Sequence, residues 1–115
     1  MATITTHVLD TSAGRPAAGV RFCLERVAPD PCEVLARGAT NIDGRCDGPV
    51  LQDAPIGTYE LHFSVAAYFR GQGVVLSDPP FLDRVTLRFG IAEADGHYHV
   101  PLWMTPWSYG TYRGS

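Results

Sequence analysis

The stretch TYELHFSV, residues 58–65, decides the fold class of this chain. Its apolar side chains at Tyr59, Leu61 and Phe63 alternate with polar ones, a period of two that is typical of a β-strand with one buried and one solvated face. An amphipathic helix would repeat its apolar positions every three to four residues instead. The stretch therefore predicts a half-buried strand in a sheet that is covered on one side.

The same alternation recurs along the chain, in segments separated by turn-forming residues. Only residues 64–70 show helical spacing, with Gly71 suited to end a short helix. Glycine, proline and aspartate supply the turns, as in Ser12–Pro16, Asp43-Gly44 and Asp95-Gly96. Short strands at this spacing predict an all-β sandwich of two sheets. We expect its other strands over residues 3–10, 20–25, 33–40, 85–91, 97–104 and 108–113.

Length and composition describe one globular domain. The 115 residues match the size of a single domain, which we assign to residues 1–115. Hydrophobic residues make up 45% and charged residues 18%, which excludes an intrinsically disordered chain. The net charge of −3 and the lack of a basic cluster argue against a nucleic-acid partner. No apolar run reaches the roughly 18 residues of a membrane span, so we expect no membrane partner.

The N-terminus and the cysteines both bear on the cellular compartment. The first residues, MATIT, lack the basic and apolar segments of an export signal. Cys23, Cys32 and Cys46 are odd in number and show no Cys-x-x-Cys spacing. Thiols that stay reduced are typical of a reducing compartment, so we expect a cytoplasmic protein.

Histidines are the first candidates for chemistry. His97 and His99 lie two apart on an expected strand, so both point to the same face, and His7 lies on the polar face of another strand. Imidazole titrates near neutrality and is suited to moving protons in a reaction. The alternative is that these are exposed histidines on a solvated sheet face. For His62, which lies between a glutamate and a serine, we predict this surface role.

A pair of histidines on one strand is also compatible with a metal site, because neutral imidazole is a common zinc ligand. A third ligand would have to be His7 or a cysteine, and none of these has the supporting spacing. No glycine-rich loop opens a long helix that could hold phosphate. We therefore predict no metal site and no cofactor.

Two further segments carry chemistry-bearing side chains. Arg45 follows a turn at Asp43-Gly44, where its guanidinium can reach over a pocket and bind anionic or carbonyl-rich ligands; otherwise it is an exposed turn residue. The chain closes on Tyr112, Arg113, a glycine and Ser115. An aromatic ring, a cation and a hydroxyl are thus concentrated where most chains carry little of interest.

Several segments, taken in order, carry a resemblance to a known family. They are TTHVLD at 5–10, GRPA at 14–17, TNIDGR at 40–45, HYHVPL at 97–102, residues 106–109, and TYRGS at 111–115. With this order and spacing the chain resembles the transthyretin-related 5-hydroxyisourate hydrolases over essentially its whole length. The terminal TYRGS is the most specific part, because it separates these hydrolases from the hormone-carrying transthyretins.

The resemblance implies a fold and an assembly. The fold would be a transthyretin-like (prealbumin-like) sandwich of two four-stranded sheets with one short helix. The assembly would be a homotetramer whose active sites lie at the dimer–dimer interface, in a channel where each site borrows residues from a neighbouring subunit. The ligand would be a small purine-derived substrate.

The resemblance also implies a reaction, the hydrolysis of 5-hydroxyisourate to 2-oxo-4-hydroxy-4-carboxy-5-ureidoimidazoline in urate breakdown. This makes the chain a cyclic amide hydrolase. By matching motifs, catalytic roles fall on His7, Arg45, His99 and Ser115, and substrate-binding roles on His7, Arg45, Tyr112, Arg113 and His97.

The residue types suggest how such a site would work. No serine or cysteine stands in a nucleophile motif, so we expect direct attack by water that a neutral histidine deprotonates. Arg45 would stabilise the oxyanion, and Tyr112 would hold the substrate ring. Ser115 offers a hydroxyl and a carboxylate that could orient a histidine. Whether His7 or His99 is the general base stays open.

Two other interpretations remain at the level of sequence. One is a transthyretin-type carrier that binds a small hydrophobic ligand in the same channel. The polar set of His7, Arg45 and His99 argues against it, because apolar ligands favour a largely apolar lining. The other is an interaction sandwich whose histidines are merely exposed.

Overall fold

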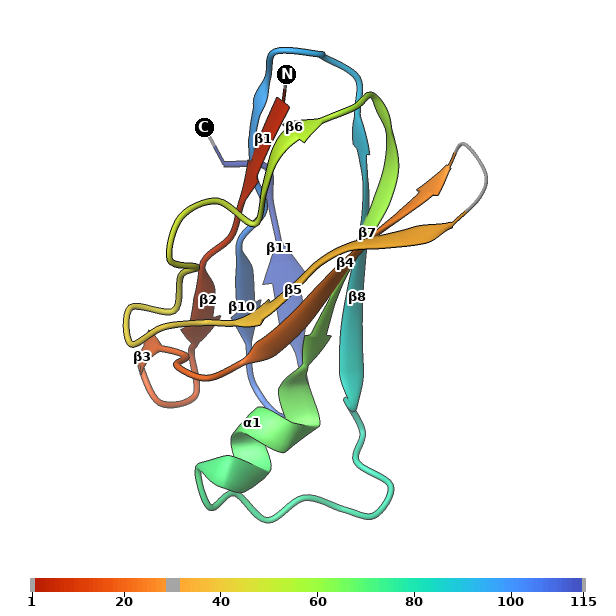
Figure 1. Ribbon diagram of the computed structural model, residues 1–115. Helices are drawn as coiled ribbons and strands as arrows, with labels where there is room; N and C mark the ends of the chain where they lie inside the picture. Colours follow the sequence, from red (N-terminus) through yellow and green to blue (C-terminus); the bar gives the residue numbers. More distant parts are fainter. Residues whose placement is uncertain (1, 29–31, 115) are drawn as a thin grey trace.

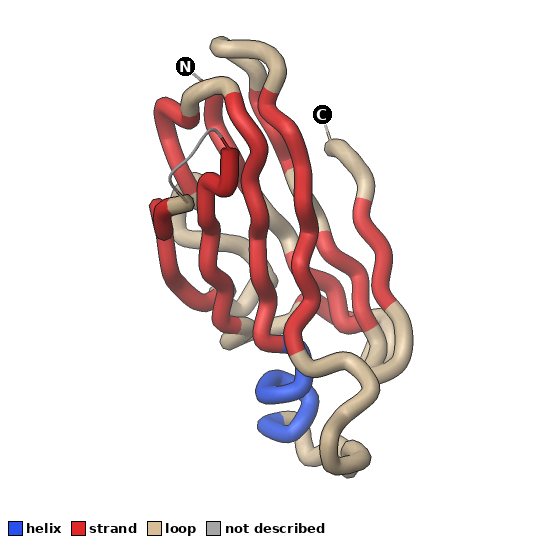
Figure 2. Tube along the Cα trace, turned by 90° about the vertical axis from the view of Figure 1, so that its right-hand side faces the viewer, coloured by secondary structure: helices blue, strands red, loops and turns tan. Residues whose placement is uncertain are grey.

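The computed structural model describes residues 2–28 and 32–114, which form a two-layered sandwich of strands with a helix at one end (Figures 1 and 2). None of the described residues forms a helix long and apolar enough to cross a membrane. The elements, in chain order, are β1 (Ala2–Thr5), β2 (Val8–Asp10), β3 (Arg15–Pro16), β4 (Arg21–Ala28), β5 (Glu33–Ala39), β6 (Leu51–Ala54), β7 (Gly57–Ser64), α1 (Val65–Gly71), β8 (Arg84–Ile91), β9 (His97–His99), β10 (Leu102–Met104) and β11 (Tyr109–Thr111).

The first layer is one antiparallel sheet in the order β5-β4-β7-β8. The alternating stretch that predicted a half-buried strand forms β7 at its centre. Tyr59, Leu61 and Phe63 point inward and are fully buried, and Phe63 lies opposite Phe22 on β4 and Val85 on β8. The strands expected over residues 20–25, 33–40 and 85–91 are confirmed as β4, β5 and β8.

The second layer consists of two short sheets, β6-β1-β9 and β3-β2-β10-β11. The fold is therefore an all-β sandwich, but residues 3–10 and 97–104 do not form the two continuous strands that we predicted. Each segment is split, at 6–7 and at 100–101. Pro101 has no N–H to donate to a ladder, which accounts for the break between β9 and β10.

The two breaks lie side by side and are joined across the gap. The backbone N–H of Val100 donates to the carbonyl oxygen of Thr5 at 2.8 Å, and that of Leu102 donates to His7 at 2.9 Å. The Thr6 hydroxyl, which points inward, donates to the Val100 carbonyl oxygen at 2.7 Å. The interruption is therefore a fixed feature of the layer with its polar groups satisfied.

Two short strands were not predicted. β3 lies in the segment that we expected to be a turn, and β6 lies in a segment to which we assigned no strand. Both are edge strands of the second layer, with two and four residues. Strands this short contain too few residues for an alternating pattern to be visible.

The helix expected over residues 64–70 is confirmed as α1, with a different ending. The glycine in the left-handed conformation is Gly73, with φ of 84°, and not Gly71. The N–H of Gly73 donates to Arg70 and the next N–H donates to Phe69, which satisfies carbonyl groups at the helix end. The Tyr68 hydroxyl donates to Asp10 Oδ2 at 2.8 Å and so connects α1 with β2.

Candidate active site

His7 lies in the break between β1 and β2, on the outward face of the second layer. It forms an isolated antiparallel bridge with Arg45, which reaches the break from a loop between β5 and β6. The imidazole is partly buried and the guanidinium is exposed. We predicted His7 on a continuous strand, and it lies in a break instead; the structure brings it together with Arg45 although 38 positions separate them.

A tight turn holds Arg45 in this position. The Asn41 side-chain oxygen accepts the backbone N–H of Asp43 at 2.9 Å and of Arg45 at 3.1 Å. Gly44 has a φ of 74°, a conformation that strains other residues, and a Cβ there would collide with the Val8 carbonyl oxygen. The Val8 N–H in turn donates to the Gly44 carbonyl oxygen at 2.8 Å. Glycine at this position therefore allows the turn to dock on β2.

His97 and His99 lie on β9 and face the same side, as their spacing predicted. Tyr98 between them points into the core and is 4% exposed. The Thr5 hydroxyl on the paired strand β1 lies 3.2 Å from His97 Nε2 and 2.8 Å from His99 Nδ1. One threonine therefore contacts both imidazoles. Its role was missed, although its spacing of two from His7 placed it on the same face.

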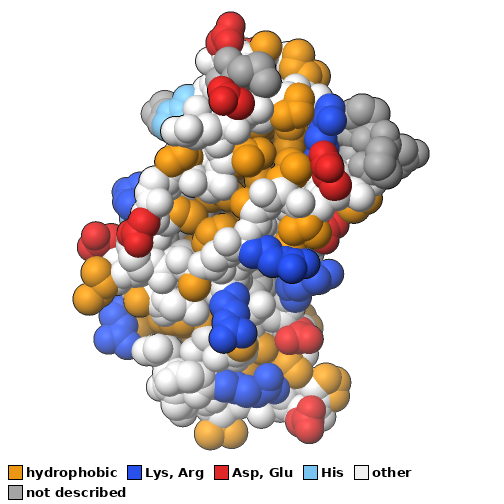
Figure 3. Space-filling model, viewed as in Figure 1, with side chains coloured by type: hydrophobic (Ala, Val, Ile, Leu, Met, Phe, Trp, Pro, Cys, Tyr) orange, Lys and Arg blue, Asp and Glu red, His pale blue; other side chains and the backbone are white. Residues whose placement is uncertain are grey.

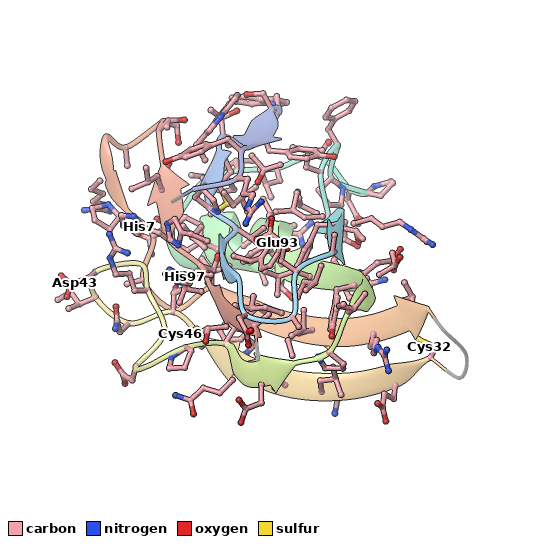
Figure 4. All side chains as sticks on the ribbon, turned by 90° about the horizontal axis from the view of Figure 1, so that it is seen from above. His7, Cys32, Asp43, Cys46, Glu93 and His97 are labelled. Carbon is pink, nitrogen blue, oxygen red and sulfur yellow. The ribbon has the colours of Figure 1, made fainter. Side chains whose placement is uncertain are left out.

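The surroundings of His7 and His99 favour the neutral form of these two imidazoles. Burial and the nearby Arg45 guanidinium both lower the pKa of His7 below its usual value of 6.5. Burial, then Arg45, and then His7 and His97 lower the pKa of His99 in the same way. Figure 4 shows His7 and His97 close together on one side of the molecule, far from Cys32. Neutral imidazoles near pH 7 can accept a proton.

The last described residues run back alongside β9. The Gly114 N–H donates to the His99 carbonyl oxygen at 2.8 Å, and the two residues form an isolated bridge. A Cβ at position 114 would lie 2.5 Å from His99 Cδ2, so this close approach requires glycine. Ser115, to which we assigned a catalytic role, lies outside the described residues.

The structure separates Tyr112 and Arg113 from the imidazoles within one chain. The Arg113 guanidinium lies 4.2 Å above the ring of Tyr98, on the other side of the β9 backbone from the histidines. Tyr112 is 63% exposed. Both line a hollow of about 550 Å³ between β8 and β11, together with Phe89 and Val100. Of the assigned site residues that the structure describes, His7, Arg45, His97 and His99 form one cluster, which we call the imidazole cluster.

His62 is buried, whereas we predicted a solvated surface histidine. It faces outward from β7 in the first layer, as the alternation requires, but it is only 5% exposed. Neighbouring side chains from β4 and β8 cover it, and its Nδ1 lies 2.7 Å from the Thr86 hydroxyl. The expectation of a solvated surface histidine is therefore wrong. The space-filling view shows histidine atoms only at one rim of the face in sight (Figure 3).

Comparisons with known proteins show what the whole chain is similar to. A family model described as HIUase/Transthyretin matches residues 4–114. The 5-hydroxyisourate hydrolase of Deinococcus radiodurans is 58% identical over 114 residues, which cover 97% of this chain and 95% of that protein.

Two solved structures resemble the chain closely. A crystal structure of (S)-allantoin synthase matches with a TM-score of 0.94 and 44% identity, covering 99% of this chain and 44% of that longer one. Sea bream transthyretin in complex with thyroxine matches with a TM-score of 0.85 and 26% identity over 97% of this chain and 94% of that one. The strands, their register and the full-length identity lead to one conclusion: the chain belongs to the HIUase/transthyretin family.

Proposed function

We propose that this protein is an enzyme that hydrolyses 5-hydroxyisourate in purine breakdown. The observation that carries the proposal is the imidazole cluster, in which two histidines with lowered pKa values lie beside one guanidinium. The identity of 58% to a full-length 5-hydroxyisourate hydrolase supports the choice of substrate. The product would be 2-oxo-4-hydroxy-4-carboxy-5-ureidoimidazoline.

In the proposed reaction, water attacks a ring carbonyl carbon of the substrate directly. A neutral imidazole of His7 or His99 accepts a proton as the water oxygen bonds to the carbon. The Arg45 guanidinium donates hydrogen bonds to the oxyanion that forms. The carbon–nitrogen bond then breaks, and the protonated imidazole returns the proton to the leaving ring nitrogen. One water is consumed, and a carboxylic acid and an N–H group are formed.

His97, Tyr112, Arg113 and Ser115 have proposed supporting roles. The shared contact with Thr5 supports a positioning role for His97 beside His99. Tyr112 and Arg113 would hold the substrate in a site completed by another subunit, since they are remote from the cluster of their own chain. The role of Ser115 rests on the resemblance, and Gly114 beside His99 is compatible with it.

We also propose that the enzyme is a homotetramer with its sites between dimers. Among the described residues, β8 and β11 are the edge strands on one side of their sheets, and the hollow of about 550 Å³ lies between them. Unpaired strand edges favour pairing with another chain. Trp103, Tyr109 and Tyr112 are large exposed side chains near this edge. Light scattering after gel filtration should give the mass of four chains.

A cytoplasmic location is the remaining proposal. Cys23 and Cys46 form no disulfide, and burial followed by the nearby Asp47 raises the pKa of the Cys46 thiol, which makes it less reactive. These thiols are compatible with a reducing compartment. Fractionation of the host cells with detection of the protein would test the location.

A carrier function explains the cluster less well. A hydrophobic ligand would leave the guanidinium and the imidazoles of the cluster without polar partners, which is costly in a closed channel. The deciding experiment generates 5-hydroxyisourate from urate with urate oxidase and follows its ultraviolet decay. We expect the protein to accelerate the decay in proportion to its concentration. Unchanged decay with folded protein would reject the enzyme and favour a carrier.

A further inference from the structure

A second polar cluster lies in the first layer, on the face that points away from the core. It consists of Glu25 on β4, and Glu60 and His62 on β7, and we call it the carboxylate–histidine cluster. The proposed hydrolysis uses none of these residues. They belong to the layer opposite the imidazole cluster, so the two clusters are separated by the core.

His62 faces both carboxylates at distances longer than a hydrogen bond. His62 Nε2 lies 3.6 Å from Glu25 Oε1 and 3.7 Å from Glu60 Oε1. Hydrogen bonds of this kind measure roughly 2.7–3.2 Å, so Nε2 makes one with neither carboxylate. Only 5% of His62 is exposed. The Thr86 hydroxyl lies 2.7 Å from Nδ1, the other ring nitrogen. Nε2 therefore lies within ion-pair distance of both carboxylates without forming a hydrogen bond to either of them.

The two carboxylates also lie close to each other, with their ligand oxygens within 4.8 Å. Glu25 and Glu60 lie directly opposite each other on adjacent strands, where like charges destabilise a sheet. Their outer oxygens have other partners, because Arg88 donates to Glu60 Oε2 at 3.3 Å and the Cys32 thiol donates to Glu25 Oε2 at 3.3 Å. Their Oε1 atoms remain directed at the imidazole.

We propose that this cluster binds a divalent metal ion, with Zn²⁺ as the preferred ion. Zinc bonds of about 2.0–2.2 Å to nitrogen and oxygen place tetrahedral ligand atoms roughly 3.3–3.5 Å apart. The separations of 3.6 and 3.7 Å exceed this range by a few tenths of an ångström, and the three ligand atoms lie within 4.8 Å of one another. Adjustment of the side chains would bring the three ligand atoms onto one ion, and water would take the fourth position.

The surroundings fit this assignment better than they fit a bare ion pair. A metal ion would neutralise the two facing carboxylates and bind Nε2, which hydrogen-bonds to neither of them. Thr86 would fix the ring orientation through Nδ1, as partners of metal-bound histidines commonly do. The imidazole favours zinc over magnesium, which prefers oxygen ligands alone. The ion would then cross-link β4 and β7 at the surface of the first layer.

The test measures zinc binding to the purified protein after treatment with a chelator. ZnCl₂ is titrated against the protein and a chromogenic zinc indicator, so that affinity and stoichiometry are both obtained. The His97→Gln variant serves as the reference, because it removes one imidazole from the other cluster and leaves this one intact. We expect one zinc per chain in the reference, and its loss when His62→Gln or Glu25→Gln is added.

Two further readouts separate binding from misfolding. Glu25→Gln is nearly isosteric at a partly exposed position, so its circular dichroism should match that of the reference. Thr86→Val leaves all three ligands in place and should weaken zinc binding roughly 10- to 100-fold. Zinc should also raise the Tm of the reference by several degrees and leave that of Glu25→Gln unchanged. Zinc that remains bound in both His62→Gln and Glu25→Gln, or no zinc bound by the reference, overturns the proposal.

Discussion

The two layers of the sandwich share one pattern of alternation and use it differently. The first layer has four strands of seven or eight residues, and its inward side chains form much of the core. The second layer has strands of two to four residues, with His7 in the break between β1 and β2 and His99 at the end of β9. The first layer, with continuous strands, contributes much of the buried core. The second layer, with interrupted strands, leaves backbone positions with which the Arg45 loop and the C-terminal tail pair.

The two bridges of the second layer arise differently. His7 lies in the break between β1 and β2, where the loop residue Arg45 pairs with it. His99 is the last residue of β9, which pairs with β1 on one edge, and the tail residue Gly114 pairs with its other edge. The site therefore combines an interruption of the second layer with a free strand edge of the same layer.

The sharpest test of this division replaces the histidines of the broken layer. His7→Asn or His99→Asn removes a proton acceptor and should lower turnover by roughly 100- to 10,000-fold. The Tm should change little, because neither side chain belongs to the core. Ultraviolet decay of 5-hydroxyisourate and thermal unfolding provide the two measurements. Near-native turnover in both variants would remove the proposed base.

The converse test acts on the continuous layer. Phe63→Ala empties a fully buried position on β7 and should cost about 3–5 kcal/mol of unfolding free energy. The activity of each folded molecule should remain close to that of the parent. Phe81→Ala is the matched control, since Phe81 is 72% exposed and should cost far less. Equal losses of stability in the two variants would contradict the assignment of the core, and denaturant titration measures both.

Two substitutions of Arg45 separate the contribution of the guanidinium shape from that of its positive charge. Arg45→Ala should reduce turnover about 100- to 1,000-fold, as expected for loss of an oxyanion donor. Arg45→Lys should be nearly as damaging, because an ammonium does not reproduce the planar fork of the guanidinium. Steady-state kinetics on both variants provide the comparison. Full recovery with lysine would show that charge alone is needed.

A substitution at Gly44 tests how the loop that carries Arg45 reaches the break between β1 and β2. Gly44→Ala adds a left-handed strain of about 1–3 kcal/mol and a collision with the Val8 carbonyl oxygen. It should lower both stability and turnover, because Arg45 is displaced. Gly48→Ala is a matched control with a φ of 89° and no atom near the added Cβ, so only the strain remains. Gly44→Ala with a loss no larger than that of Gly48→Ala would argue against the close approach.

The smallest expected effect is a shift in pH dependence. Burial and Arg45 lower the pKa of His99, so the imidazole stays neutral and active to a pH below 6.5. The acid limb of kcat/KM should therefore fall below pH 6.5. In Arg45→Gln the positive charge is lost, the pKa of both His7 and His99 rises, and the limb moves to higher pH. Arg45→Lys should retain the parental limb. An unmoved limb in Arg45→Gln would show that the guanidinium does not act on the base.

Local sequence patterns explain which features could be predicted, and contacts between segments distant in sequence explain which could not. Alternation identified β7 and its neighbours, and it placed His97 and His99 on one face, because these features need only the period of a strand. It could not reveal the break at Thr6-His7, since inward and outward residues keep alternating across it. That break depends on a loop that is remote in sequence.

The same limit explains His62 and the chain end. The burial of His62 arises from side chains on β4 and β8, which no local window contains. The separation of Tyr112 from the imidazoles depends on the path of β11 beside β10. The family resemblance grouped these residues by function, whereas the structure shows which of them lie close together within one chain.

The contact between Tyr68 and Asp10 has a consequence for how the molecule responds to acid and base. Burial, and then the hydrogen bond to Asp10, raise the pKa of Tyr68 to about 12, so this phenol keeps its proton throughout the range in which imidazoles titrate. The hydroxyl donor that connects α1 with β2 is thus unaffected by the protonation of His7 and His99. Acid that charges those imidazoles leaves the Tyr68 phenol in its neutral form.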